Sequence, residues 1–80
     1  MEIEEVLSKY IKSNFEIDDD PEFTEEAHLF DMGFIDSLGA TEVILYIEEY
    51  WNIEITQKDL ILYPMNTIKE IAEVIERKLV

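Results

Sequence analysis

The hydroxyl of Ser37 has the best-defined chemical setting in this sequence. Ser37 follows Asp36 and precedes residues with helical spacing, so the pair predicts the start of a helix, where either side chain can accept a hydrogen bond from a free backbone amide. A helix N-terminus carries unpaired amides and a partial positive charge, both of which favour a phosphate group. Gly39 removes bulk beside the hydroxyl and would help another protein's active site to reach it. A phosphodiester on Ser37 is therefore physically reasonable, although an Asp-Ser pair alone more often serves only as a cap.

Other reactive side chains lack the surroundings that catalysis or metal binding needs. His28 is the only histidine, and a lone histidine in a loop is more often a surface residue than a base. A serine esterase would need glycine at position 35, where the chain has Ile35. Asp18, Asp19 and Asp20 suggest calcium, but the glycine and the closing glutamate of an EF-hand loop are missing. We therefore expect no catalytic residue and no metal site.

The composition excludes several classes of protein. Eighty residues make one domain over residues 1–80, with one modest core and little volume for an enclosed active site. There is no cysteine, so the protein itself supplies neither a disulfide nor a thiolate. The N-terminus is acidic where a secretory signal would be basic, and no apolar run is long enough for a membrane span. A soluble, cytoplasmic monomer is the simplest expectation.

The charge of the chain is −14, and its distribution is more informative than its sum. From residue 13 to residue 57 there is no lysine or arginine, while thirteen carboxylates fall in that stretch. Nucleic acid is excluded as a partner, because binding to it depends on cations that neutralise phosphates. A partner protein with a basic surface is favoured instead, through long-range attraction.

Apolar spacing predicts an all-α fold. Residues 2–13 read as an amphipathic helix, and residues 14–36 as a long loop with a short turn of helix near 25–30. A second helix runs from Asp36-Ser37 to near Asn52. A linker follows, then a short helix over 57–61 that Thr56 caps, and a last helix that opens with a capping box of Thr67 and Glu70. The expected inward stripes are Ile3, Val6, Leu7, Tyr10 and Ile11; then Ala40, Ile44, Ile47 and Trp51; then Ile68, Ile71, Ala72, Ile75 and Leu79. Three main helices and one short helix thus form a bundle.

The segment around Ser37 has a specific pattern, with Asp36-Ser37-Leu38 at the start of the second helix, Gly33 upstream and Glu42 one turn on. This pattern resembles the acyl and peptidyl carrier proteins, and the resemblance extends from Leu29 to the last helix. It implies an acyl-carrier-like four-helix bundle and a non-catalytic carrier. In that family the serine matched by Ser37, beside Asp36, carries 4'-phosphopantetheine, which a phosphopantetheinyl transferase adds from coenzyme A. The thiol of the arm then holds an acyl or aminoacyl group as a thioester.

Several segments distinguish this chain within that family, namely Leu29-Phe30-Asp31, Gly33, Ile35-Asp36-Ser37, Gly39, Glu42, Ile47-Glu48 and Asn66-Thr67. With these segments the chain looks most similar to the D-alanyl and other stand-alone aminoacyl carriers. This resemblance implies two further partners, an adenylating acyl or aminoacyl ligase and a downstream acyl-accepting enzyme.

The second helix also offers a face that could bind a partner. It lies opposite the core stripe and combines two leucines with carboxylates, which suits docking to a basic helix or groove. We call it the partner face of the second helix, and it consists of Leu38, Thr41, Glu42, Leu45, Glu48 and Glu49. A helix of this kind always has a charged outer face, so solubility alone is the competing interpretation.

Bulky residues in the expected core favour a short cargo. Ile44, Ile47 and Trp51 should face Leu60, Tyr63 and Ile68 with few voids between them, and forcing a long acyl chain into such packing is costly. We therefore favour an aminoacyl or D-alanyl cargo, with a fatty-acid or polyketide acyl carrier as the alternative. An acidic helical interaction module without modification is the alternative of another class, and an enzyme is a distant third.

Overall fold

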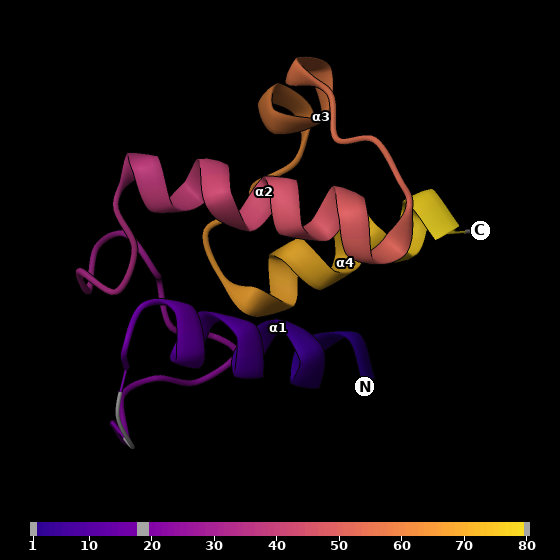
Figure 1. Cartoon of the computed structure of the whole chain (residues 1–80). Helices are drawn as coiled ribbons and strands as arrows, with labels where there is room; N and C mark the ends of the chain where they lie inside the picture. Colours follow the sequence, from indigo (N-terminus) through magenta and orange to yellow (C-terminus); the bar gives the residue numbers. More distant parts are fainter. Residues whose placement is uncertain (1, 18–19, 80) are drawn as a thin grey trace.

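The computed structural model describes residues 2–17 and 20–79 of the chain. Four helices account for the regular structure of these residues: α1 (Glu2–Asn14), α2 (Ser37–Trp51), α3 (Gln57–Leu62) and α4 (Ile68–Leu79). Figure 1 shows α1 and α4 beneath α2, with the short α3 on the opposite side of α2. The described part of the chain contains no strand, which confirms the predicted all-α bundle of three main helices and one short helix.

The core forms where α1, α2 and α4 meet. Its fully buried side chains come from these three helices and from the first loop: Leu7, Ile11, Leu29, Ile47, Ile68 and Ile75. Burial of such side chains stabilises the fold by about 1.5–3 kcal/mol each relative to exposure. Ser37 therefore lies on a helix whose other face is fixed in the main core.

The inward stripe of α2 differs from the predicted one. Ile47 is fully buried as expected, but the other buried residues of α2 are Gly39 and Val43, while Ala40 and Ile44 are only partly covered. Residues 39, 43 and 47 recur every four positions and occupy one side of the helix. The neighbouring side, which carries Ala40 and Ile44, borders a cavity whose other walls come from two loops, α3 and α4, so its packing is incomplete.

The predicted helix ends are largely correct. Asn52 ends α2 in the left-handed conformation, with φ 53°, and its N–H donates to the carbonyl of Glu48. Thr56 and Asp59 form the capping box of α3, which extends one residue further than predicted, to Leu62. At the start of α4, Thr67 accepts a hydrogen bond from the N–H of Glu70. In α4, Val74 is buried although the predicted inward stripe did not include it. Leu79 was part of that stripe, but it lies in the last turn and is half exposed.

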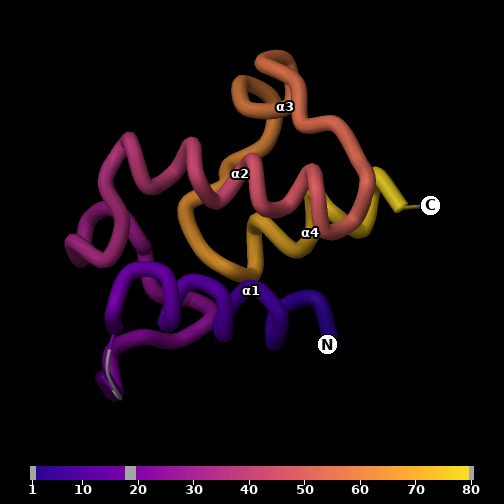
Figure 2. The backbone as a smooth tube through the Cα atoms, viewed as in Figure 1, coloured from indigo at the N-terminus to yellow at the C-terminus, as the bar shows by residue number. Residues whose placement is uncertain are grey.

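The long loop between α1 and α2 is fastened to the rest of the molecule. Figure 2 shows it turning back beside α1 before it reaches the start of α2. Two backbone hydrogen bonds join it to the start of α4, from Leu29 N–H to the Asn66 carbonyl (2.9 Å) and from Lys69 N–H to the Glu25 carbonyl (3.0 Å). The turn of helix expected near 25–30 is replaced by non-helical turns. These bonds fix the part of the loop from Glu25 onward, which determines how the chain enters α2.

Candidate functional site

Asp36 caps α2, and this leaves the Ser37 side chain unused. Asp36 has extended backbone angles (φ −102°, ψ −176°), and its Oδ1 accepts a hydrogen bond of 2.7 Å from the N–H of Gly39. Ser37 is the first residue of the helix, and its side chain is exposed. Within the described part of the chain its hydroxyl makes no hydrogen bond. Of the two side chains that could cap, the structure thus assigns the cap to Asp36 and presents Ser37 to solvent.

The backbone around Ser37 suits an anionic group. The first hydrogen bond of the helix ladder runs from Ala40 N–H to the Asp36 carbonyl (2.9 Å), and the Gly39 N–H is taken by the cap. Among the described residues, the amides of Ser37 and Leu38 have no acceptor. Together with the positive end of the helix dipole, they favour a phosphate there.

Gly39 has a different role from the one that its sequence position suggested. We expected its missing side chain to clear a path to the Ser37 hydroxyl, but Gly39 is buried. A Cβ atom on Gly39 would stand 2.7 Å from Cε1 of Phe15 and 2.9 Å from Cγ2 of Ile35. Because these contacts are shorter than any real Cβ contact, the glycine allows the end of α1 and the end of the loop to pack against the first turn of α2.

A tight turn delivers the chain to Ser37. The carbonyl of the fully buried Leu29 accepts hydrogen bonds from the N–H groups of Phe34 (2.9 Å) and Ile35 (3.1 Å). Gly33 makes the reversal possible with a φ of +78°, which a residue with a side chain rarely adopts. Since Ile35 is buried as well, Ser37 is held two residues beyond an anchored position.

A hollow opens directly beside Ser37. Its volume is about 350 Å³, and it lies between the start of α2, the end of α1 and the turn at Gly33. Ser37 sits in the chain between two of its lining residues. We call it the Ser37 hollow, and it is lined by Phe15, Gly33, Phe34, Asp36, Leu38, Gly39 and Glu42.

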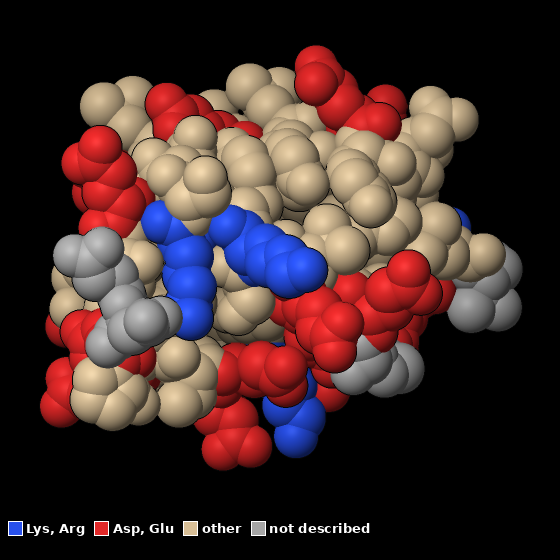
Figure 3. Space-filling model, turned by 60° about the horizontal axis from the view of Figure 1, so that its bottom comes forward, with Lys and Arg blue, Asp and Glu red and all other residues tan. Residues whose placement is uncertain are grey.

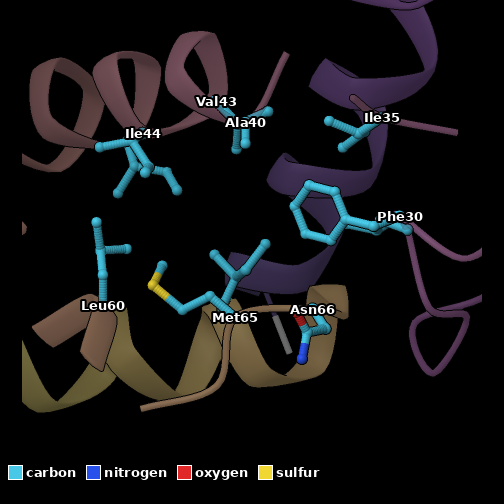
Figure 4. Close-up of a pocket in the computed structure, with 11 residues that line it drawn as sticks. Phe30, Ile35, Ala40, Val43, Ile44, Leu60, Met65 and Asn66 are labelled. Carbon is cyan, nitrogen blue, oxygen red and sulfur yellow. The ribbon is translucent and has the colours of Figure 1, made fainter. Parts of the chain in front are cut away.

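A second, more apolar cavity lies between α2, α3 and the loops. Its volume is about 190 Å³, and Figure 4 shows Ala40 and Ile44 of α2 facing Leu60 and Met65 across it. We call it the inner cavity, and it is lined by Leu29, Phe30, Ile35, Ala40, Val43, Ile44, Ile47, Leu60, Met65, Asn66 and Ile71. The expectation of few voids in this region is therefore wrong. Ile44, Ile47 and Leu60 line the cavity as expected, whereas Trp51, Tyr63 and Ile68 do not.

The residues of the α2 partner face differ in exposure and in hydrogen bonding. Leu38 and Leu45 are 78% and 55% exposed, and Thr41, Glu42 and Glu49 are exposed too. Glu48 is half-buried, and its Oε2 accepts a hydrogen bond of 2.9 Å from the N–H of Ile55. Its carboxylate therefore holds the linker after α2, a contact between residues seven apart that helical spacing does not reveal.

Glu42 also connects two elements. Its Oε2 accepts a hydrogen bond of 3.2 Å from Nδ2 of Asn14, which ties the end of α1 to α2. Burial, and after it the Glu42 carboxylate and Tyr46, raise the pKa of the Tyr10 phenol on α1. Glu42 thus has three positions at once: it joins α1 to α2, it lines the Ser37 hollow, and it is part of the α2 partner face.

Helix α3 exposes apolar side chains that the sequence prediction did not assign to a surface. Ile61 is 82% exposed, and Leu60 and Leu62 are about half exposed. A signal for this exists in the sequence, because three consecutive apolar residues in a helix of six cannot all point inward. Phe15, by contrast, had no such signal, since its contact partner Gly39 is far away in the chain.

Charge is unevenly distributed over the elements. α2 contains no lysine or arginine, so the basic residues lie on α1, α3 and α4. Figure 3, which views the side of the molecule that carries α1, shows basic side chains gathered near the middle of a face otherwise rich in acidic ones. The charge of α2 is therefore wholly negative, whereas this middle region carries cations.

Among the described residues no group of three or more side chains is placed to hold a metal ion, and no helix reaches the length and apolarity that a membrane span requires. Of the aspartates considered for calcium, Asp18 and Asp19 lie outside the described residues, and Asp20 accepts a hydrogen bond from the N–H of Glu22. His28 Nδ1 accepts one from the N–H of Asp31 (3.1 Å), which places it in a turn.

Comparison with known proteins identifies one family. The family model described as a phosphopantetheine attachment site matches residues 5–75. Neither a curated protein nor a solved structure matches the chain. The match covers α2, α3 and most of α1 and α4, and so includes the Ser37 hollow and the inner cavity.

Proposed function

We propose, from the premise that this chain belongs to the phosphopantetheine attachment family, that Ser37 is the residue to which 4'-phosphopantetheine is attached. The observation that carries the proposal is the exposed hydroxyl of Ser37, which makes no hydrogen bond within the described residues because Asp36 has taken over the cap. Asp36 acts as a positioning residue, since its bond to Gly39 sets the first turn of α2.

The residues around Ser37 fit the group chemically. Oγ of Ser37 would lose its proton and form the phosphodiester bond, while the pyrophosphate bond of coenzyme A would break and release its adenosine bisphosphate half. The acceptor-free amides of Ser37 and Leu38 suit the phosphate that results. When bound, the arm supplies a thiol for an acyl thioester, which a chain without cysteine cannot provide itself. The protein then acts as a carrier and not as an enzyme.

The partners follow from this role. A phosphopantetheinyl transferase must reach Ser37, an adenylating ligase must load the thiol, and an acyl-accepting enzyme must unload it. We propose that they dock on the exposed members of the α2 partner face, Leu38, Thr41, Glu42, Leu45 and Glu49, through basic surfaces. We propose further that the carrier is a cytoplasmic monomer.

We propose a short acyl or aminoacyl cargo, on the basis of the resemblance to the D-alanyl and stand-alone aminoacyl carriers. Such a group stays on the arm in solvent and needs no space within the helices. The expected tight packing no longer supports a short cargo, because the inner cavity leaves space between the helices.

The inner cavity favours a second candidate, a medium-chain acyl cargo. Its volume of about 190 Å³ exceeds that of an engineered apolar cavity of about 150 Å³ that binds benzene. Attachment of an octanoyl and an alanyl group to the arm separates the two candidates. An octanoyl chain that enters the cavity shifts the methyl resonances of Ile44, Leu60 and Met65 and raises the melting temperature. If octanoyl and alanyl give the same spectrum, the chain remains outside.

Intact-mass measurement tests the attachment residue. After incubation with coenzyme A and a broad-specificity phosphopantetheinyl transferase, the wild type should gain the mass of one phosphopantetheine. Ser37→Ala should fold and gain none, whereas Ser13→Ala, which changes another exposed serine, should be modified like the wild type. Modification of Ser37→Ala would show that another residue carries the arm. A wild type that several transferases leave unmodified would favour the unmodified interaction module.

A further inference from the structure

The Ser37 hollow combines an apolar surface with two unused hydrogen-bond acceptors. Phe15, Phe34 and Leu38 supply the apolar part, and the two lining glycines add no side chains. Asp36 and Glu42 supply the carboxylates. One oxygen of each already accepts a hydrogen bond, from Gly39 N–H and from Asn14 Nδ2 respectively. Within the described residues the other oxygen of each has no partner, and no basic side chain lines the hollow.

This lining favours a ligand that donates hydrogen bonds and disfavours an anion. Two carboxylates repel an anion, so the phosphate itself belongs outside the hollow, at the amides of the helix start. An apolar body with N–H or O–H donors fits both parts of the lining. The hollow, of about 350 Å³, is shallow and open toward solvent, so a ligand would lie against its wall and keep one side in water.

The phosphopantetheine arm has this chemistry just beyond its phosphate. The pantoyl unit carries two methyl groups on one carbon and a hydroxyl, and two amide N–H groups follow. The arm would also begin at the rim, because Ser37 lies between Asp36 and Leu38, which both line the hollow. A tether of this length gives an effective concentration on the order of millimolar, so weak contacts are enough to populate the site.

We infer that the Ser37 hollow is a resting site for the pantoyl part of the arm in the unloaded carrier, with the methyl groups against Phe15 and Phe34 and the donors toward Asp36 and Glu42. The inference rests on the proposed attachment at Ser37. The inner cavity is the competing location, but its lining has no charged side chain and Asn66 is its one polar residue, so it suits a hydrocarbon better than amides.

Nuclear magnetic resonance of the unloaded holo protein tests the inference, after intact mass has shown complete modification. The two pantoyl methyl resonances should move upfield from their positions in free phosphopantetheine, because the rings of Phe15 and Phe34 shield protons that lie over them. Nuclear Overhauser contacts should join these methyl groups to the protons of both rings. The amide of Gly33, four residues before the attachment point, should shift between the apo and holo forms.

Two matched pairs of variants on α2 localise the effect. Leu38→Ala and Glu42→Gln change the hollow, whereas Leu45→Ala and Glu49→Gln change exposed residues of the same types that do not line it. The upfield displacement of the methyl resonances should fall by at least half in the first pair and persist in the second. Apo spectra verify that each variant is folded.

The outcomes separate this inference from the proposed function. A fully modified protein whose methyl resonances match free phosphopantetheine, or contact Ile44, Leu60 or Met65 instead, would overturn the resting site and leave the carrier intact. Equal effects in both pairs of variants would also overturn it. A wild type that gains no mass would remove the proposed function and the resting site together.

Discussion

The ring of Phe15 lies so close to the backbone of Gly39 that a Cβ atom on Gly39 would stand 2.7 Å from Cε1 of the ring. Phe15 follows the last residue of α1, and Gly39 lies in the first turn of α2, two residues after Ser37. The contact therefore decides how closely the end of α1 approaches the start of α2. It also forms one wall of the Ser37 hollow.

Gly39→Ala should destabilise the protein. Overpacking against Phe15 and Ile35 costs ~1–3 kcal/mol, and better helix propensity returns up to about 1 kcal/mol, so the free energy of unfolding should fall by roughly 1–2 kcal/mol in urea titrations. The cost should shrink in a Phe15→Leu background, where the ring no longer blocks the Cβ atom. An equal cost in both backgrounds would contradict the contact with Phe15.

Asp36→Ala and Ser37→Ala should differ sharply in stability. Loss of the N-cap bond from Gly39 to Asp36 should cost about 0.5–2 kcal/mol, whereas the Ser37 hydroxyl holds no hydrogen bond within the described residues and its loss should be nearly neutral. Asp36→Asn should retain most of the stability, because an amide oxygen can still accept. Comparable losses for the two alanine variants would mean that Ser37 shares the cap.

The ion pair between Asp59 and Lys78 should confer a stability that depends on pH. It joins α3 to the last turn of α4, and the Lys78 ammonium, with help from the Thr56 N–H, lowers the pKa of Asp59 from 3.8 to about 2. Because the folded-state pKa is the lower one, the stabilisation is present above pH 3.8 and is lost as the pH falls toward 2. Lys78→Met should therefore be less stable than the wild type near neutral pH and approach it near pH 2.

Lys69→Met is the control for this measurement, since it removes an exposed cation from the same helix and changes the net charge equally. Its difference from the wild type should vary less with pH between 2 and 4. A Lys78→Met difference that stays constant over that range would show that Asp59 titrates normally in the folded protein.

Glu48 and Glu49 should respond differently to charge reversal. Glu49 is exposed, so Glu49→Lys should slow association with a basic partner while stability changes by no more than about 0.5 kcal/mol. Glu48→Lys should additionally lower the free energy of unfolding by about 1–3 kcal/mol, because the N–H of the buried Ile55 loses its acceptor. Stopped-flow binding and urea titration measure the two effects, and equal stabilities would refute the role of Glu48.

Added salt should raise the melting temperature. A net charge of −14 on eighty residues makes the compact state repel itself, and screening or bound cations relieve this repulsion. Calorimetry in rising sodium chloride and in millimolar magnesium measures the effect. A melting temperature that changes with neither salt would indicate that the repulsion is equally strong in the unfolded chain.

The amino-acid sequence by itself determined the features that depend on neighbours in the chain. The three main helices follow from apolar spacing. A cap at Asp36 or Ser37 and the caps at Thr56 and Thr67 follow from side chains that can reach amides a few residues ahead, and in the structure each cap reaches the amide three residues ahead. Interactions of this range need no knowledge of the rest of the fold. Ser37 became the candidate attachment residue through its position at the start of a helix together with the resemblance of the surrounding segment to the acyl and peptidyl carrier proteins.

Only the tertiary structure decided what depends on segments that are distant in sequence. The packing role of Gly39 needs Phe15, the burial of Val43 in place of Ala40 and Ile44 depends on which elements cover α2, and the bond from Ile55 to Glu48 needs the linker to turn back. The Ser37 hollow and the inner cavity arise in the same way, because each is bounded by segments from several parts of the chain. Local spacing states which side of a helix is apolar, but the space left between helices depends on how all of them pack together.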